Sequence, residues 1–143
     1  MEETVRAVGH DNVTARHTST FEVTTDDFLT PAGDCILGIR ADRAPRDFTP
    51  AFRDHCSDAS ATIVATLTAA GHTQTVTGRG HPDLTLASSR SLVARTSTYV
   101  DDRTVMVAAD HAAGDLDRAL VDALASGETL TLTLRVTDGA VTD

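Results

Sequence analysis

The clearest pattern along the chain is a strict alternation of apolar and polar residues close to its C-terminal end. Leucine or valine occupies every second position from residue 130 to residue 136, with threonine or arginine between them. A period of two in residues that favour strands predicts a half-buried β-strand. Similar runs predict further strands at residues 13–24, 35–41, 61–67, 84–94 and 103–109.

Two segments have the spacing of a short amphipathic helix instead. Apolar residues recur every three to four positions in residues 116–124, where Asp115 is the expected N-cap and Gly127 the stop. Asp47 precedes a matching stripe earlier in the chain, and Pro50 stands in its first turn, where proline is tolerated.

These elements occur in the same order twice because the sequence contains an internal repeat. Residues 4–10 (TVRAVGH) match residues 75–81 (TVTGRGH) at an offset of 71. Residues 41–48 match residues 109–116 at an offset of 68, after a three-residue difference near residues 25–30. The repeat suggests an internal duplication of one supersecondary unit.

The repeat and the predicted elements together indicate the fold class. The two halves, at about 1–72 and 73–143, are each too small to bury a core that would make them stable alone. We therefore expect a single domain, 1–143, with one core around a pseudo-twofold axis. We predict a mainly β (α+β) fold: an antiparallel β-sandwich or barrel-like domain built from an internal duplication, with one short helix per half.

Composition and charge indicate habitat more than partners. All 12 basic residues are arginine, 17 of the 21 acids are aspartate, and the net charge is -9. Lysine-free, aspartate-rich chains with small apolar residues are typical of halophilic archaea, so the charge is expected to act as a solubility device in molar salt, where screening is strong. The alternative is a specific cationic partner. The acidic balance argues against nucleic acid, whose recognition needs a basic patch.

Motifs and targeting signals narrow the classes further. No apolar run is long enough for a membrane span, and the N-terminal residues lack signal-peptide character, so we expect a cytoplasmic protein without a membrane partner. The six histidines and two cysteines lack metal-ligand spacing, and we predict no metal site. No phosphate loop, dinucleotide motif or nucleophile elbow is present, so no cofactor is indicated.

Polar residues that occur in both halves most economically serve the shared backbone. His10 and His81 each follow a glycine able to take a positive φ, and they either lock turns or meet at the pseudo-axis as a ligand pair. Asp42 and Asp110 follow strands and either bond the strand-to-helix loop or contribute to a site there. Asp34, whose counterpart is also aspartate, is expected to begin a strand.

Polar residues that occur in only one half cannot be explained by the shared backbone, so each needs its own structural or functional explanation. Cys56 falls on the apolar helix stripe and is expected to be a buried thiol. Cys35 matches an arginine; it is either inert or a nucleophile, and the adjacent Asp34 opposes thiolate formation. His17 matches a serine and is either a satisfied core histidine or a site residue. Glu22 is either a surface carboxylate or a site acid.

Several of these stretches resemble the archaeal domain-of-unknown-function family 371. They are residues 9–13 (GHDNV), 17–24 (HTSTFEVT), 29–38 (LTPAGDCILG), 41–42, 80–81, 103–104, 109–110 and 115–118. The resemblance covers nearly the whole chain and implies an archaeal, mainly β protein; it brings no activity, cofactor or catalytic residue. Family members tend to have lysine after both Ala-Asp pairs, where this chain has Arg43 and His111.

Three functions are open from the sequence. The first is a small binding module for an anionic small molecule or metabolite, with a site between the halves. Its candidate residues are His10, His17, Asp34, Cys35, Asp42, Arg43, His81 and Asp110. The second is an enzyme in which His10 or His17 acts as a general base oriented by Asp34 or Asp42, with or without a metal. The third is an interaction or assembly protein that offers a sheet edge.

Overall fold

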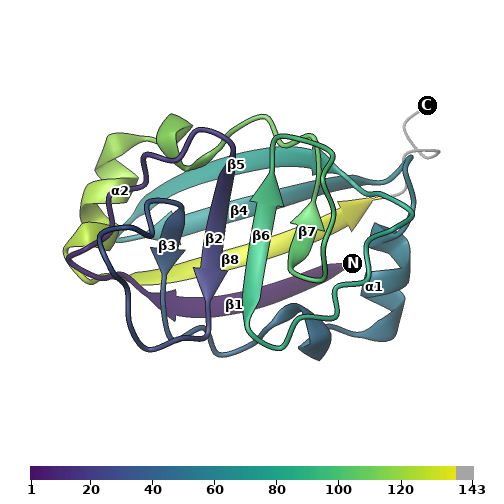
Figure 1. Ribbon diagram of the computed structural model, residues 1–143, viewed down its shortest axis with the longest axis horizontal. Helices are drawn as coiled ribbons and strands as arrows, with labels where there is room; N and C mark the ends of the chain where they lie inside the picture. Colours follow the sequence, from purple (N-terminus) through teal and green to yellow (C-terminus); the bar gives the residue numbers. More distant parts are fainter. Residues whose placement is uncertain (138–143) are drawn as a thin grey trace.

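The computed structural model describes residues 1–137, which form two four-stranded β-sheets packed against each other (Figure 1). Sheet A has the spatial order β1 (Glu2–Val8), β8 (Thr129–Thr137), β4 (Thr62–Ala69) and β5 (His72–Arg79). Sheet B has the order β3 (Ile36–Gly38), β2 (Thr20–Thr24), β6 (Ser91–Arg95) and β7 (Thr104–Met106). The predicted mainly β, sandwich-like architecture is confirmed.

Sheet A is antiparallel throughout, but sheet B is mixed. Its central pair, β2 and β6, is antiparallel, whereas β3 pairs with β2 and β7 with β6 in parallel. The mostly antiparallel arrangement that we expect is thus present, with parallel pairing at the two outer pairs of sheet B. The physical reason is that residues 25–35 and 96–103 cross back to the start of their strand instead of turning tightly, as a parallel connection requires.

The sheet B strands are shorter than the alternation predicts. Of residues 13–24 only Thr20–Thr24 form a strand, and of residues 84–94 the strand begins at Ser91. Ala15 and Leu86 have positive φ angles of 49° and 47°, which take the backbone out of the extended region. Both side chains are nevertheless buried, so the alternation records burial without a strand.

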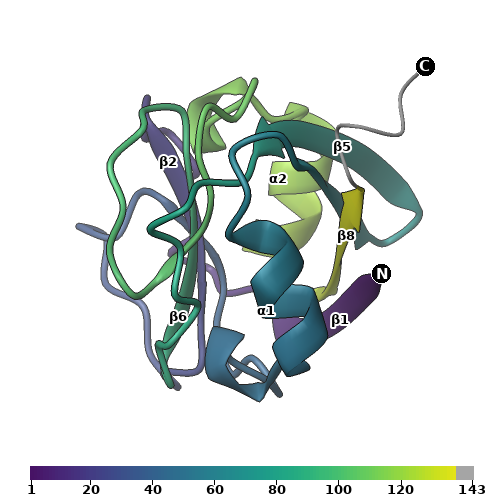
Figure 2. The ribbon, with the colours of Figure 1, turned by 90° about the vertical axis from the view of Figure 1, so that its right-hand side faces the viewer.

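Two helices cover opposite ends of the sandwich. Figures 1 and 2 place α1 (Pro50–Cys56) and α2 (Arg118–Ala125) at the two ends, where each closes the space between the sheets. Phe52 and Cys56 of α1, and Leu120 and Leu124 of α2, are at most 1% exposed. The prediction that Cys56 is a buried thiol is confirmed. None of the helices among residues 1–137 has the length and apolar character to cross a membrane.

The predicted helix caps are wrong by two residues. The N-caps are Thr49, whose hydroxyl accepts from the Phe52 amide, and Asp117, whose carboxylate accepts from the Ala119 amide. Asp47 and Asp115 instead end the 3₁₀ turns that precede the helices. There, each carboxylate accepts a hydrogen bond of 2.9 Å from the amide three residues earlier.

Strands from the two halves of the chain alternate in sheet A, and in sheet B the two halves meet at the central pair β2–β6. In sheet A, β4 pairs with β8 through seven registered residues, and in sheet B β2 pairs with β6 through five. Isolated bridges between Val8 and Ile39, and between Arg79 and Val107, join the edge strands of sheet A to the segments that follow β3 and β7. The edges of sheet A are thus partly paired, which limits their availability to another chain.

Candidate functional site

The duplicated histidines His10 and His81 each accept a backbone hydrogen bond within their own turn. The Nδ1 atoms accept from the Asn12 amide at 2.9 Å and the Asp83 amide at 3.0 Å. Gly9, beside His10, donates to the Glu128 carbonyl after α2, whereas His81 donates its own amide to the Cys56 carbonyl of α1. Because the helices lie at opposite ends (Figure 1), the structure does not bring the two histidines together.

The glycine before each histidine is needed for a close approach and not for a positive φ. Positive φ angles among the described glycines occur at Gly71 and Gly127. A Cβ atom at Gly9 would overlap the Leu124 carbonyl, and one at Gly80 would overlap the Cys56 carbonyl. The Gly-His pairs therefore seat each turn against the C-terminal end of a helix.

Asp42 and Asp110 hold the edge strands of sheet A. The Asp42 carboxylate accepts from the Arg6 amide at 2.9 Å, and its own amide donates to the Arg6 carbonyl. Asp110 makes the same pair of contacts with Thr77 of β5. Each aspartate thus continues the ladder of an edge strand by one residue.

The Arg43 side chain is engaged in contacts within the first half of the chain. Its guanidinium pairs with Glu3 at 2.6 Å, donates to the Thr4 carbonyl at 3.0 Å, and lies 5.3 Å from the centre of the Phe48 ring. Glu3 is only 7% exposed, and its other oxygen accepts from the Thr49 amide. Arg43 therefore ties β1 to the start of α1 and leaves little of its charge for a ligand.

His17 and Asp34 stabilise the bend that leads into β2. The His17 Nδ1 accepts from the amides of Ser19 and Thr20, and the Asp34 carbonyl accepts from the amides of Arg16 and His17. Within residues 1–137, no hydrogen bond joins the imidazoles of His10 or His17 to the carboxylates of Asp34 or Asp42. The histidine–aspartate pairs considered for acid–base chemistry are not assembled.

Among the candidate site residues, Cys35 contacts Glu22, and neither of these two residues has an identical counterpart in the other half of the repeat. Its Sγ donates to Glu22 Oε1 at 3.6 Å, on the face of sheet B that points away from sheet A. Burial, and after it the charge of Glu22, raises the pKa of the Cys35 thiol to about 11. The thiol is therefore protonated at neutral pH and is a neutral donor, not a nucleophile.

Two arginines and one aspartate lie on the same outer face of sheet B. Asp101 Oδ2 accepts from Arg95 at 2.9 Å and from Arg103 at 3.1 Å. Arg95 also donates to the Thr104 hydroxyl at 2.8 Å. Burial alone would raise the pKa of the Asp101 carboxyl. Hydrogen bonds from Arg103 and Thr104, together with the charge of Arg95, outweigh burial and lower this pKa to about 2. We call Glu22, Cys35, Arg95, Asp101 and Arg103 the sheet B cluster.

The register of sheet B places this cluster where the two halves meet. Glu22 pairs directly with Val93, the residue 71 positions later. Arg95 stands 71 positions after Thr24, and Arg103 stands 68 positions after Cys35. The first half contributes Glu22 and Cys35, and the second half contributes Arg95, Asp101 and Arg103.

Sequence reasoning identified part of this cluster. Cys35 was a candidate, and Glu22 was weighed because its counterpart is valine; Arg95, Asp101 and Arg103 were missed. Comparing the repeat halves for charged residues as well as for cysteine and histidine would have marked all three, since their counterparts are threonine, glycine and cysteine.

The cluster can present a fixed cation to solvent. Arg103 is 43% exposed, and Asp101 holds its guanidinium through two contacts of 3.1 and 3.3 Å. A planar guanidinium held in one orientation is suited to carboxylate or phosphate oxygens. The neighbouring Glu22 disfavours an anion that lies directly over it, so an anionic group would bind on the Arg103 side of the cluster.

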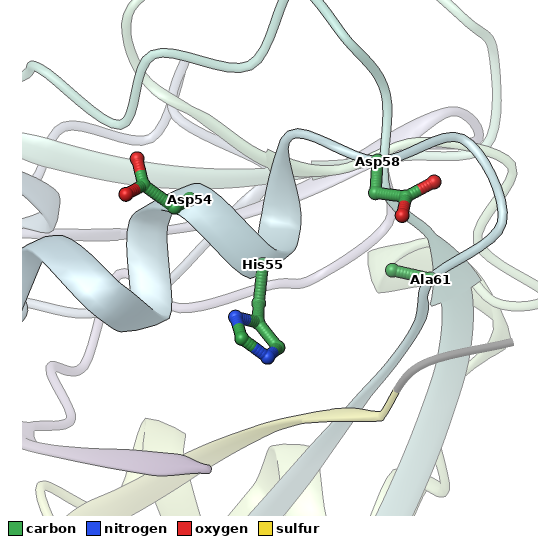
Figure 3. Close-up of a pocket in the computed structure, with 4 residues that line it drawn as sticks. All are labelled: Asp54, His55, Asp58 and Ala61. Carbon is green, nitrogen blue, oxygen red and sulfur yellow. The ribbon is translucent and has the colours of Figure 1, made fainter. Parts of the chain in front are cut away.

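Apart from the sheet B cluster, a hollow of about 200 Å³ lies at the C-terminal end of α1 and is lined by Asp54, His55, Asp58 and Ala61 (Figure 3). His55 Nδ1 contacts the Ala51 carbonyl at 3.2 Å, and Asp58 accepts from Ser60. In Figure 3 the side chains of Asp54 and His55 point to different sides of the helix. Among residues 1–137, no three metal-ligating side chains gather here or elsewhere. This hollow is therefore the weaker candidate.

Comparison with known proteins extends over almost the whole chain. A family model described as a domain of unknown function (DUF371) matches residues 5–137. An uncharacterized protein of Methanocaldococcus jannaschii is 40% identical over 130 residues, which cover 91% of this chain and 96% of that protein. The matched region includes the sheet B cluster and both helices.

Proposed function

The chain belongs to the DUF371 family of unknown function, and on that premise we propose that it is a small binding module for an anionic small molecule or metabolite. The proposed site is the sheet B cluster. Arg103 is the group that contacts the anion, Asp101 holds Arg103 in place, Arg95 in turn holds Asp101, and Glu22 and Cys35 border the site.

The observation that carries this proposal is the convergence of unduplicated charges. The residues shared by both halves, such as Asp42 and Asp110, are engaged in backbone contacts. Three charged residues without a charged counterpart in the other half, Arg95, Asp101 and Arg103, instead gather on one face, in mutual contacts of 2.9 to 3.3 Å around Asp101. A repeat needs no such asymmetry to fold, so a ligand is the better reason for it.

The preference for an anion follows from exposure. Arg95 is 11% exposed and Asp101 22%, so their charges largely satisfy each other. Arg103 shares Asp101 with Arg95, so one carboxylate serves two guanidinium groups. Glu22 makes the five residues neutral in sum, but on the side of the cluster away from Glu22 the exposed guanidinium of Arg103 is available to a carboxylate or phosphate group.

The test is a titration of ¹⁵N-labelled protein with inorganic phosphate and with benzoate, followed through the arginine Nε–H resonances. We expect the Arg103 and Arg95 signals to shift, and we expect Arg103→Gln to weaken binding about tenfold or more, the value of one lost charge-assisted hydrogen bond. Arg135→Gln is the matched control because Arg135 is exposed on sheet A, away from the cluster. The control should bind as the unchanged protein does.

Two results would overturn the proposal. One is the absence of any arginine shift with both probes, repeated in molar potassium chloride. The other is equal weakening by Arg103→Gln and Arg135→Gln, which would point to a general charge effect.

We also propose that the fold arose by internal duplication and forms a single domain, 1–143. The equivalent contacts of His10 and His81, and of Asp42 and Asp110, support the duplication. The pairing of β4 with β8 supports one shared core. Expression of residues 1–72 alone should yield an unfolded chain, because its strands lack their partners; a cooperative unfolding transition would refute the shared core.

The composition supports a proposal about environment. A lysine-free chain with 17 aspartates is suited to the cytoplasm of a halophilic archaeon, and two free cysteines suit a reducing compartment. We expect the thermal midpoint to rise between dilute and molar potassium chloride. A midpoint that falls with salt would contradict this habitat.

A further inference from the structure

Two aromatic side chains of this chain are exposed, and they stand 71 positions apart. The chain has five aromatic residues; Phe21, Phe48 and Phe52 are at most 2% exposed, whereas Phe28 and Tyr99 are 57% and 61% exposed. Phe28 lies in the segment that follows β2, and Tyr99 in the segment that follows β6. Figure 2 shows both segments outside sheet B, on the side away from sheet A.

Tyr99 differs from Phe28 because it is connected to the sheet B cluster. The Arg95 guanidinium lies 4.8 Å from the centre of the Tyr99 ring. Arg95 and Arg103 both donate to the same oxygen, Asp101 Oδ2. The ring, the buried guanidinium and the exposed guanidinium are therefore joined by consecutive contacts through Asp101.

The arrangement of Tyr99 favours a planar ligand. A ring that stacks on Arg95 and is still 61% exposed offers its remaining surface to solvent. The guanidinium fixes the ring from one side, so a ligand ring can stack against it with little loss of side-chain entropy. Arg103, which is 43% exposed, is joined to Arg95 through the Asp101 carboxylate, so it is the cation available to the charged end of such a ligand.

We propose that Tyr99 is the specificity-determining wall of the site, and that the ligand carries a planar aromatic ring beside its carboxylate or phosphate group. This inference rests on the proposed function, since Arg103 supplies the contact to the anionic group. Phe28 has no such arginine stack among residues 1–137 and is assigned no part in ring recognition.

The test compares benzoate with cyclohexanecarboxylate, which share a carboxylate and a six-membered carbon ring but differ in planarity. Benzoate should bind about threefold to tenfold more tightly, the range expected for one aromatic contact. Tyr99→Phe should keep this preference and Tyr99→Leu should remove it. Phe28→Leu, an equally exposed substitution at the matching position, should leave it unchanged.

The outcomes separate this inference from the proposed function. If both acids bind through Arg103 with equal affinity, or if the preference survives in Tyr99→Leu, the aromatic wall is wrong and the anion site stands. Loss of the preference in Phe28→Leu would overturn the assignment to Tyr99. If neither acid shifts the Arg103 resonance, both proposals fall. Thermal midpoints of the variants check that each is folded.

Discussion

The imidazole of His17 and the hydroxyl of Ser88 make the same contacts at positions 71 apart. His17 Nδ1 accepts from the amides two and three residues later, at 3.3 and 3.2 Å. Ser88 Oγ accepts from the amides two and three residues later, at 3.1 Å each. An acceptor is thus required at the bend before β2 and before β6, and the identity of the side chain is secondary.

His17→Ser is therefore expected to be nearly neutral, whereas His17→Ala leaves two amides without their acceptor. We expect a loss of about 0.5 kcal/mol or less for serine and about 1 kcal/mol or more for alanine in the free energy of unfolding. Urea denaturation measures both. Equal losses for the two variants would contradict the acceptor role of His17.

The fold could be predicted from the sequence where local pattern and burial agree. Residues 130–136 alternate and form β8, with every second residue buried. At Ala15 and Leu86 the same alternation occurs without a strand, because the φ angles are positive. Positive φ angles are rare in alanine and leucine, and the hydrophobic pattern of a sequence does not indicate where they occur. At the start of α1, Asp47 and Thr49 are both good caps, but the Asp47 carboxylate accepts from the Ala44 amide and the Thr49 amide donates to Glu3.

The candidate site was less predictable because it combines two local groups of side chains that only the pairing of β2 with β6 brings to one sheet. Arg95 and Asp101 come from the second half, and Glu22 and Cys35 come from the first. The offset of the repeat aligns Glu22 with Val93, but nothing in the offset indicates that these two positions pair across a strand interface. That relation depends on β2 and β6 being neighbours, which the order of elements alone does not determine.

Gly80→Ala is expected to destabilise the protein because its Cβ would meet backbone that cannot move aside. The nearest atoms are the carbonyl oxygens of Cys56 and Asp58. Overpacking of this kind costs about 1–3 kcal/mol, and we expect the upper end at Gly80. Gly33→Ala is the control, since its Cβ meets the end of the Leu29 side chain, which can rotate. A smaller loss at Gly80 than at Gly33 would contradict the seating of the turn against α1.

Asp101 is expected to contribute stability that disappears in acid. Its pKa of about 2 in the folded protein lies below the ordinary value of 3.8, so the folded state favours the ionised form. The contribution is complete above about pH 4 and is lost as the pH falls through about 2. A difference of this size corresponds to about 2 kcal/mol for a side chain that is 22% exposed.

The measurement for Asp101 is urea denaturation of the unchanged protein and Asp101→Asn from pH 7 to pH 2. The difference in unfolding free energy should be about 2 kcal/mol at neutral pH and should shrink between pH 4 and pH 2. Asp102→Asn is the control because Asp102 is the adjacent, exposed aspartate. A difference that is constant with pH would show that Asp101 acts through packing and not through its charge.

Cys35 is expected to react slowly with alkylating agents, and Glu22 is part of the reason. Burial and then the charge of Glu22 raise the pKa of the Cys35 thiol to about 11, so thiolate is scarce at pH 8. Glu22→Gln removes the charge 3.6 Å from the sulfur, which should lower this pKa and accelerate alkylation by iodoacetamide.

Cys56 is fully buried and should stay unreactive, so mass spectrometry of the intact protein counts modification at Cys35 alone. Glu128→Gln makes the same change at an exposed site elsewhere and should leave the rate as it was. An unchanged pH profile of alkylation in Glu22→Gln would show that burial alone sets the pKa of Cys35 and that the charge of Glu22 does not affect it.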